Sequence, residues 1–294
     1  MEFYKFVKDY RDNPVLRSSF NRLAEKTFCL DFEPWYQHGF WTEKYNPYSI
    51  VYNGEVVSSI SVSQMEFTKN GEKKHYIQLG AVMTDEAYRN QGLSRKLMEE
   101  ILLEYEGKTD GIYLFANKSV LDFYPKFGFR KEIQWEYSIE LDSKENASAK
   151  KASVQKVSME TKEDWEKFIP IIQSSVANSS LDFKQPEITM FYLSNFMKDN
   201  VYYIPEHQAY VVAERDNNIL YLQQIYSSKE LLPEQAAVEF GSNIKKVIFE
   251  FTPLHKECYQ KHLHADVDDT LFVIGEDLKD FTAQELAFPI LSHT

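Results

Sequence analysis

The sequence has few cysteines and no long apolar run. Cys29 and Cys258 are its only cysteines, and they lie too far apart to indicate a disulfide framework or the paired spacing of a metal site. No apolar stretch approaches the ~20 residues of a membrane helix, and the first residues lack the basic and then apolar layout of a secretory signal. We therefore expect a cytoplasmic protein with no membrane partner.

The sequence also lacks a positive charge excess. The net charge is −12, and both halves are acidic: residues 1–145 carry 19 Lys and Arg against 23 Asp and Glu, and residues 146–294 carry 14 against 22. Such a chain repels a phosphate backbone, which argues against nucleic acid as a partner. An acidic surface attracts a cationic amine, although the same charge also serves solubility alone.

The histidines of the second half give no metal signature. His255, His262 and His264 lie near Cys258, but their spacing matches no tetrahedral zinc pattern. We therefore expect no metal.

A polar segment rich in small residues divides the chain. Residues 143–153 contain no aliphatic core former and are typical of a linker. The division predicts a first domain over residues 1–142 and a second over residues 154–294.

The first domain alternates between strand and helix patterns. β-rich runs at 48–52 and 55–67 flank Asn53-Gly54, a strong hairpin signal, and a further strand is expected at 76–83. Apolar residues then recur every four positions from Leu93 to Tyr105, which predicts an amphipathic helix. A strand at 111–116, a helix at 119–126 and a strand at 135–141 follow. The order predicts an α+β fold, with a mixed, mostly antiparallel sheet flanked by helices.

The second domain repeats this order. Helices are expected from a capping box at Thr161 to about residue 175 and over 186–198, then a hairpin around 216–218, a helix at 232–240, and strands at 246–252 and 270–274. The repeated order predicts a divergent duplication of the first domain.

One strand-to-helix junction carries the clearest chemical signal. After the strand, the turn 89–94 leads into the helix, where backbone N–H groups lack intrahelical partners and the helix dipole is positive. A diphosphate suits such a place. Gly92 and the small Ser94 allow close approach to the backbone, and Arg89 adds charge; the alternative is a plain helix start with a packing glycine.

These residues resemble the cofactor signature of the GNAT superfamily of N-acetyltransferases. The pattern Arg89-x-x-Gly92-x-Ser94 is similar to Arg/Gln-x-x-Gly-x-Gly/Ala, with Ser at the last position. The resemblance implies an acyl-CoA N-acyltransferase fold, acetyl-CoA as donor substrate, and a degenerate second copy. The cofactor-binding residues that it implies are Ala81, Val82, Met83, Thr84, Arg89, Asn90, Gln91, Gly92, Leu93, Ser94 and Asn117.

A second segment supports the resemblance. Residues 117–129 contain an Asn after a strand, an aromatic-Tyr pair and a Gly-Phe, as in a later block of that family. The resemblance implies that Tyr124 is the general acid for the thiolate and that Asn117 bonds the cofactor arm. A core tyrosine and a helix cap are the structural alternatives.

The general base is harder to assign. Gln78 and Gly80 occupy the stretch where some GNAT enzymes carry a glutamate, so the candidates are Glu33, Glu66 and Asp31, a water chain, or an amine that arrives neutral. The apolar segment 288–294 is expected to be docked, either as an edge strand or with its terminal carboxylate near the cleft.

A cluster of aromatic residues lies in the segment that we expect to line the acceptor side. Trp35, Tyr36, Phe40 and Trp41 lie close together before the first hairpin, where they could hold an amine by cation–π contact or simply pack a helix. We expect an N-acetyltransferase that acts directly on the primary amine of a small molecule or peptide, with a non-catalytic acyl-CoA sensor as the alternative. The sequence leaves open whether the protein forms a homodimer.

Overall fold

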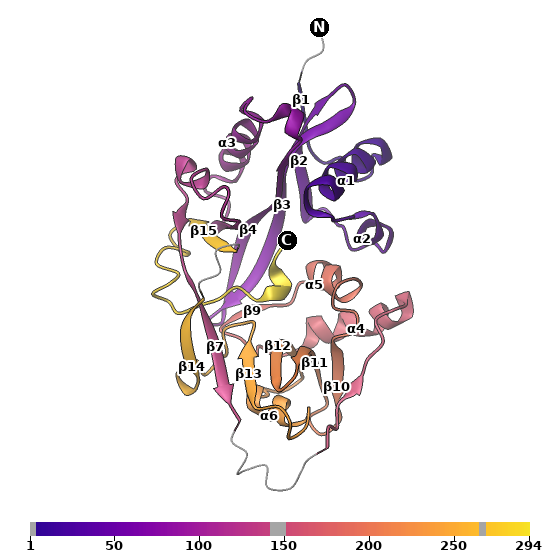
Figure 1. Ribbon diagram of the computed structural model, residues 1–294, viewed down its shortest axis with the longest axis vertical. Coiled ribbons are helices and arrows are strands. Elements are labelled where there is room, and N and C mark those ends of the chain that lie inside the picture. Colours follow the sequence, from indigo (N-terminus) through magenta and orange to yellow (C-terminus); the bar gives the residue numbers. More distant parts are fainter. Residues whose placement is uncertain (1–3, 142–150, 265–268) are drawn as a thin grey trace.

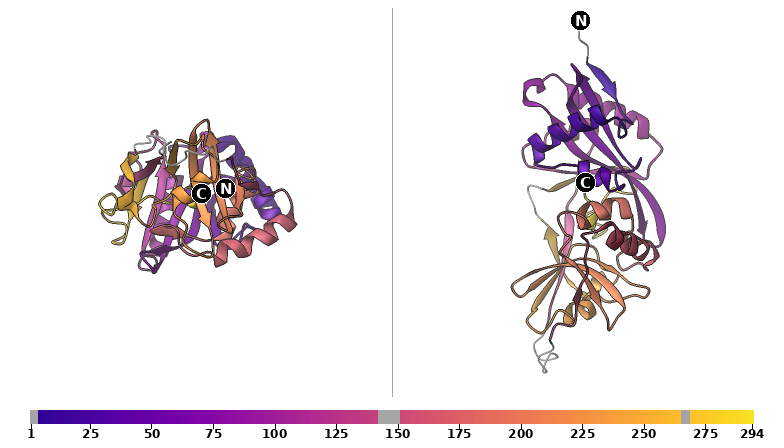
Figure 2. Two further views of the ribbon diagram at one scale, coloured as in Figure 1. Left: turned by 90° about the horizontal axis from the view of Figure 1, so that it is seen from below. Right: turned by 90° about the vertical axis from the view of Figure 1, so that its right-hand side faces the viewer.

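The computed structural model describes residues 4–141, 151–264 and 269–294. Two sheets lie end to end along an elongated molecule, and the last residue of the sequence lies between them (Figures 1 and 2). The predicted linker falls largely outside the described residues.

The upper sheet consists mainly of strands from the first half of the chain. Its order is β1-β2-β3-β4-β5-β15-β6, and β9 pairs with the far end of β3. All neighbours are antiparallel except β4 and β5, which are parallel. The bounds are β1 Lys5–Val7, β2 Tyr45–Tyr52, β3 Glu55–Lys69, β4 Glu72–Thr84, β5 Gly111–Ala116, β15 Thr270–Ile274, β6 Arg130–Lys131 and β9 Leu181–Phe183.

The lower sheet repeats this arrangement. Its order is β14-β7-β13-β12-β11-β10-β8, with β12 and β13 parallel. The bounds are β14 Gln260–His264, β7 Gln134–Glu140, β13 Lys246–Phe249, β12 Ile219–Tyr226, β11 Ala209–Asp216, β10 Val201–Ile204 and β8 Gln155–Lys156. The unit β12-α6-β13 corresponds to β4-α3-β5, so the predicted duplicated fold of mixed, mostly antiparallel sheets is confirmed.

The helices cover the sheets on both sides. Their bounds are α1 Pro14–Phe28, α2 Glu33–Gln37, α3 Leu93–Tyr105, α4 Lys162–Ser174, α5 Pro186–Leu193 and α6 Pro233–Val238. The expected faces are buried: Leu97 and Ile101 of α3 are fully inaccessible. The capping box between Thr161 and Asp164 begins α4, as expected.

The two halves exchange a strand. β7, from the end of the first half, lies between β13 and β14 of the lower sheet, and β15, from the second half, lies between β5 and β6 of the upper sheet. Each strand is antiparallel to its new neighbours. The sheets therefore do not separate at the linker in sequence, because each sheet is completed by the other half of the chain.

One expected element is absent from the described structure. Residues 119–126 form turns, and only Tyr124–Phe127 is helical, as a short 3-10 turn. The predicted helix was wrong because Pro125 lacks an amide hydrogen and Gly128, in a left-handed conformation (φ 88°), ends the turn.

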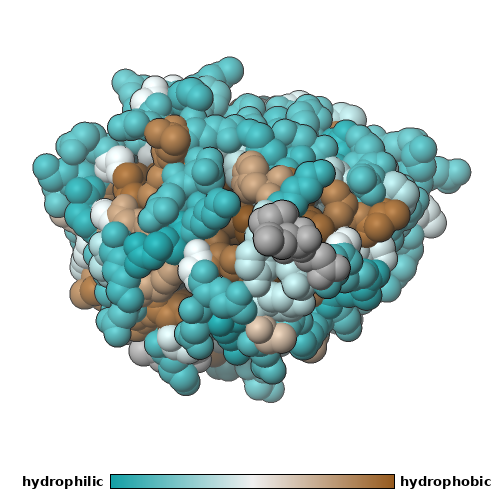
Figure 3. All heavy atoms as spheres, turned by 90° about the horizontal axis from the view of Figure 1, so that it is seen from above, coloured by the Kyte–Doolittle hydropathy of each residue, from teal (hydrophilic) through white to brown (hydrophobic). Residues whose placement is uncertain are grey.

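The surface is mostly hydrophilic. The view from above the N-terminal end shows apolar patches within a polar face (Figure 3). No helix in the described part of the chain has the length and apolar character needed to cross a bilayer.

Candidate active site

The end of β4 leads into α3 through a turn whose backbone donors are open. A 3-10 turn, Glu86–Tyr88, follows β4, and Gly92 precedes the first helical residue in a left-handed conformation (φ 76°). Within the described residues, no group accepts a hydrogen bond from the N–H of Gly92, Leu93 or Ser94. A Cβ added at Gly92 would meet no atom within 4 Å outside its two chain neighbours, so the space beside Gly92 is open.

Hydroxyl groups tie this turn to the sheet. The Ser94 hydroxyl lies 2.7 Å from that of Thr84, which lies 2.8 Å from the hydroxyl of Ser58 on β3. The Arg89 Nε donates to the Thr84 carbonyl at 3.2 Å, and its guanidinium stays more than half exposed. The small residue at position 94 thus fixes the helix start to the strand end.

The parallel strands β4 and β5 separate beside this turn. Their pairing stops at Leu79 and Leu114, so the backbone of β4 beyond Gly80 has no partner strand on that side. Ala81 has a left-handed backbone (φ 42°), and the pairing of β3 with β4 shifts at the same place. The bulge bends β4 away from β5 and leaves an open strand edge.

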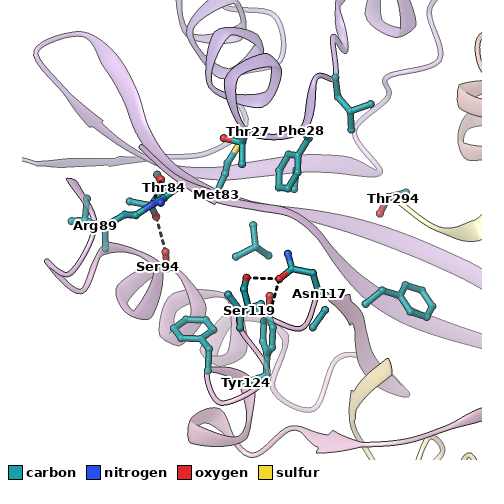
Figure 4. A pocket seen from close by; sticks show the side chains of 18 of the residues that line it. Thr27, Phe28, Met83, Thr84, Arg89, Ser94, Asn117, Ser119, Tyr124 and Thr294 are labelled. Carbon is teal, nitrogen blue, oxygen red and sulfur yellow. Dashed lines mark hydrogen bonds between the residues drawn. The ribbon is translucent and has the colours of Figure 1, made fainter. Parts of the chain in front are cut away.

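A single cavity of about 1070 Å³ occupies this opening. All but one of the predicted site residues line it; the exception is Gln91, which accepts a hydrogen bond from the Tyr4 hydroxyl at 2.6 Å. Arg89, Thr84 and Ser94 lie at one end of the cavity and Thr294 lies at the other (Figure 4). The lining residues from the predicted set are Ala81, Val82, Met83, Thr84, Arg89, Asn90, Gly92, Leu93, Ser94, Asn117 and Tyr124.

Tyr124 and Asn117 lie on one wall of this cavity, across from Met83 and Phe28 (Figure 4). Tyr124 is 3% exposed, and burial raises the pKa of its phenol to about 12. The hydroxyl therefore keeps its proton at neutral pH. The Asn117 Oδ1 accepts a hydrogen bond from the Ser119 N–H at 3.0 Å. This is the contact expected of a helix cap, but here it begins a turn.

The three candidate acids do not line the cavity. Glu33 accepts from the Arg17 Nε at 2.8 Å, and Asp31 accepts from the Glu33 N–H at 2.9 Å. Glu66 lies 3.3 Å from the Lys44 ammonium beside a second, smaller cavity. These carboxylates stabilise helix ends and ion pairs, and the structure does not bring them to the site.

Gln78 and Gly80 instead receive the end of the chain. The Thr294 hydroxyl donates to the buried Gln78 Oε1 at 2.9 Å and lies 3.1 Å from the Ser63 hydroxyl. A Cβ on Gly80 would lie 2.3 Å from the Thr294 carbonyl oxygen. Glycine is therefore needed at position 80 so that the last residue can reach the cavity.

Aromatic stacking holds this final segment in place. The Phe288 ring stacks on Tyr113 at 3.9 Å, the His293 ring stacks on Phe115 at 3.8 Å, and the Tyr192 hydroxyl donates to the His293 carbonyl at 2.8 Å. Burial lowers the pKa of His293 to about 3, so its ring is neutral. The segment is docked, as expected, but not as an edge strand.

The predicted aromatic wall is only partly right. Trp35 lines the cavity, whereas Phe40 and Trp41 are buried in the core and Tyr36 packs against the Arg17 guanidinium at 3.6 Å. No pattern in the sequence indicated Ile188 and Phe191 of α5, which complete the wall from the second half of the chain. The pairing of β9 with β3 brings α5, which follows β9 directly, to this place.

The histidines of the second half lie elsewhere. His262 and His264 both face Glu136 of β7, at 2.8 and 3.5 Å, and His255 lies 2.8 Å from Glu230. In the part of the chain that the structure describes, no group of three or more His, Cys, Asp or Glu side chains has an arrangement that could hold a metal ion.

Comparison with known proteins agrees with this geometry. Residues 13–129 match the model of the acetyltransferase (GNAT) family. This part of the chain is therefore similar to a GNAT domain. That match covers the end of β4, the turn before α3 and Tyr124, and no curated protein sequence matches the chain.

Solved structures extend the likeness beyond the GNAT domain to the whole chain. A conserved protein of unknown function from Enterococcus faecalis V583 has a TM-score of 0.60 at 13% identity, covering 96% of this chain and 74% of that one. A GCN5-related N-acetyltransferase from Anabaena variabilis has a TM-score of 0.57 at 18% identity, covering 92% of this chain and 72% of that one. A GCN5-related N-acetyltransferase from Kribbella flavida has a TM-score of 0.56 at 14% identity, covering 92% of this chain and 71% of that one. At these identities the likeness concerns the fold, which includes both sheets.

Proposed function

We propose that the protein is an N-acetyltransferase that moves an acetyl group from acetyl-CoA directly to the primary amine of a small molecule or peptide. The observation that supports it most is the cavity at the separation of β4 and β5. Open N–H donors at the start of α3, an open strand edge and the Tyr124 side chain all line it. The exposed free cysteines, Cys29 and Cys258, fit a reducing compartment such as the cytoplasm.

The donor substrate fits the residues at the α3 end. The free N–H groups of Gly92, Leu93 and Ser94, with the helix dipole, suit a diphosphate, and Arg89 adds charge. The open edge of β4 suits an extended amide-bearing arm, because its backbone groups have no partner strand on that side. The thioester supplies the activated acetyl group.

Groups of the protein itself would stabilise the developing negative charge and supply the proton for the leaving sulfur. A backbone N–H near Val82 or Met83 would bond the oxygen on which negative charge develops. Tyr124 would donate its proton to the leaving sulfur. Its raised pKa, about 12, keeps the phenol protonated throughout the physiological range.

Release of free thiol from acetyl-CoA with a panel of primary amines tests the proposal. We expect Tyr124→Phe to lower kcat about a hundredfold and to leave CoA affinity unchanged. Tyr137→Phe is the matched control, since that phenol is also buried with a pKa of about 12 but lies in the lower sheet. It should leave kcat unchanged.

The alternatives predict other results. Tight CoA binding without turnover across the panel, together with an inert Tyr124→Phe, would favour an acyl-CoA sensor. Absence of any thermal stabilisation by acetyl-CoA would reject both the enzyme and the sensor.

A further inference from the structure

The cavity has a second part that donor-binding residues do not fill. We call it the acceptor chamber, and its walls come from the end of α1, α2, β2 and α5. The residues that line it are Phe28, Leu30, Phe32, Trp35, Tyr45, Ile188 and Phe191. None of these side chains is charged, and five of the seven carry an aromatic ring.

We infer that this chamber takes the apolar, ring-sized body of the acceptor amine, so that the substrate is an arylalkylamine or branched alkylamine and not a polycation. The inference rests on the proposed function. It concerns the acceptor side of the same site.

The deep wall of the chamber is a packed set of rings. Phe32 stacks on Phe191 with centroids 5.6 Å apart and planes 15° apart, and Trp35 meets Phe191 edge-on at 5.5 Å. Phe32, Trp35 and Tyr45 are at most 4% exposed, and Ile188 is 1% exposed. Flat side chains in these orientations favour a flat apolar guest packed beside them.

The mouth of the chamber is apolar as well. Phe28, which lines the cavity near the surface, is 38% exposed. An apolar rim continuous with an apolar interior gives an uncharged body a path from the surface inward.

The carboxylate side chains of Glu33 and Glu187 are engaged elsewhere, and Asp122, which lines the cavity, is not part of the chamber. Glu33 is paired with Arg17, and Glu187 of α5 faces Lys44 at 3.7 Å beside a separate cavity of about 240 Å³. A second ammonium group on the substrate would therefore be buried in the chamber without a carboxylate side chain, which is unfavourable.

The same surroundings affect the reacting amine. Burial in an apolar chamber disfavours the charged form and lowers the pKa of an amine. The chamber thus increases the fraction of neutral nucleophile at a given pH. Amines that are mostly protonated in solution should therefore react faster at neutral pH than their solution ionisation predicts.

Binding can be measured without turnover, because Trp35 lines the chamber. The full-length protein, saturated with CoA, is titrated with 2-phenylethylamine and separately with spermidine while tryptophan fluorescence is followed. We expect saturable quenching or a spectral shift with 2-phenylethylamine alone, and its loss in Trp35→Phe.

Substitutions at Phe191 locate the effect. We expect Phe191→Ala to weaken 2-phenylethylamine binding about tenfold with CoA affinity unchanged, and Phe191→Leu to restore most of it. Phe196→Ala is the matched control: the same change on an exposed ring that does not line the chamber. It should change binding less than twofold.

A series of linear alkylamines provides a second readout in the thiol-release assay. Each added methylene should raise kcat/KM about fourfold until the chamber is filled. Preference for spermidine, an unchanged affinity in Phe191→Ala, or a gain in rate with longer acyl-CoA donors in place of longer amines would overturn the inference.

Failure of the inference and failure of the proposed function give different results. Turnover of polycations without Phe191-dependent binding of 2-phenylethylamine would overturn the chamber's role and leave the acetyltransferase in place. Phe191-dependent binding without thiol release would support the chamber and count against the proposed reaction.

Discussion

Gly92 and Gly71 share a left-handed backbone in different surroundings. Their φ values are 76° and 84°, and a Cβ on either would meet no atom within 4 Å. Alanine at each position therefore costs backbone strain alone, about 1 kcal/mol of unfolding free energy. We predict that Gly92→Ala also weakens CoA binding, because it places a methyl group over the open N–H donors. Denaturant unfolding and calorimetric titration with CoA measure the two effects.

Gly71 supplies the control for this comparison. It lies in the hairpin between β3 and β4, outside the residues that line the cavity. Gly71→Ala should lose the same stability with unchanged CoA affinity. Equal CoA affinity in both variants would show that the turn before α3 is not the diphosphate site.

The raised pKa of the Glu250 carboxyl predicts that the free energy of unfolding depends on pH. Burial, helped by the nearby Glu136, raises the pKa of its carboxyl from 4.5 to about 6. The folded state therefore holds a proton that the unfolded state releases, so this contribution to stability is full below pH 4.5 and is lost as pH rises through 6. Glu250→Gln should be more stable than the wild type at pH 7, by up to about 2 kcal/mol.

Thermal unfolding at several pH values checks that prediction. The advantage of Glu250→Gln should disappear near pH 4.5. The exposed Glu206→Gln serves as control and should show no such trend. A pH-independent advantage would indicate a packing effect in place of ionisation.

At the scale of elements, the end of the chain and β4 depend on each other. The methyl group of Gly80→Ala would lie 2.3 Å from the Thr294 carbonyl oxygen, so residues 288–294 must move. We expect kcat/KM for the acceptor to fall about tenfold, in the range of a misplaced positioning contact. Affinity for CoA, measured by titration, should stay the same.

Ser63→Ala is the comparison for this variant. It removes only a hydroxyl contact to Thr294 and introduces no overlap. It should retain most activity. If Gly80→Ala were equally active with every amine, the final segment would have no part in forming the acceptor side.

At the scale of the whole molecule, the exchanged strands join the two halves. β15 supplies Leu271, Phe272 and Val273 to the upper sheet, each at most 2% exposed. We predict that a chain ending at residue 141 does not fold, because β5 loses its neighbour and the core loses these side chains. Circular dichroism should show no cooperative transition for this fragment, and a single transition for the full chain. Independent folding of the fragment would contradict the structural role given to β15.

The sequence by itself determined the local structure and most of the residues at the α3 end of the cavity. Asn-Gly turns, the apolar repeat of α3 and the pattern from Arg89 to Ser94 are short-range signals, since backbone conformation and helix-end donors depend on neighbouring residues. Periodicity carries no information about which sheet a strand joins. Only the tertiary structure placed β7 and β15 in the opposite sheets, and α5 and Thr294 beside the cavity.

The aromatic segment before the first hairpin illustrates the same division. The sequence indicated rings near Trp35, but burial in the core or exposure to the cavity depends on packing against α5, which lies some 150 residues away in the chain. The local structure of the turn 89–94 was therefore predictable, whereas the walls of the proposed acceptor chamber were not, because they are assembled from both halves of the molecule.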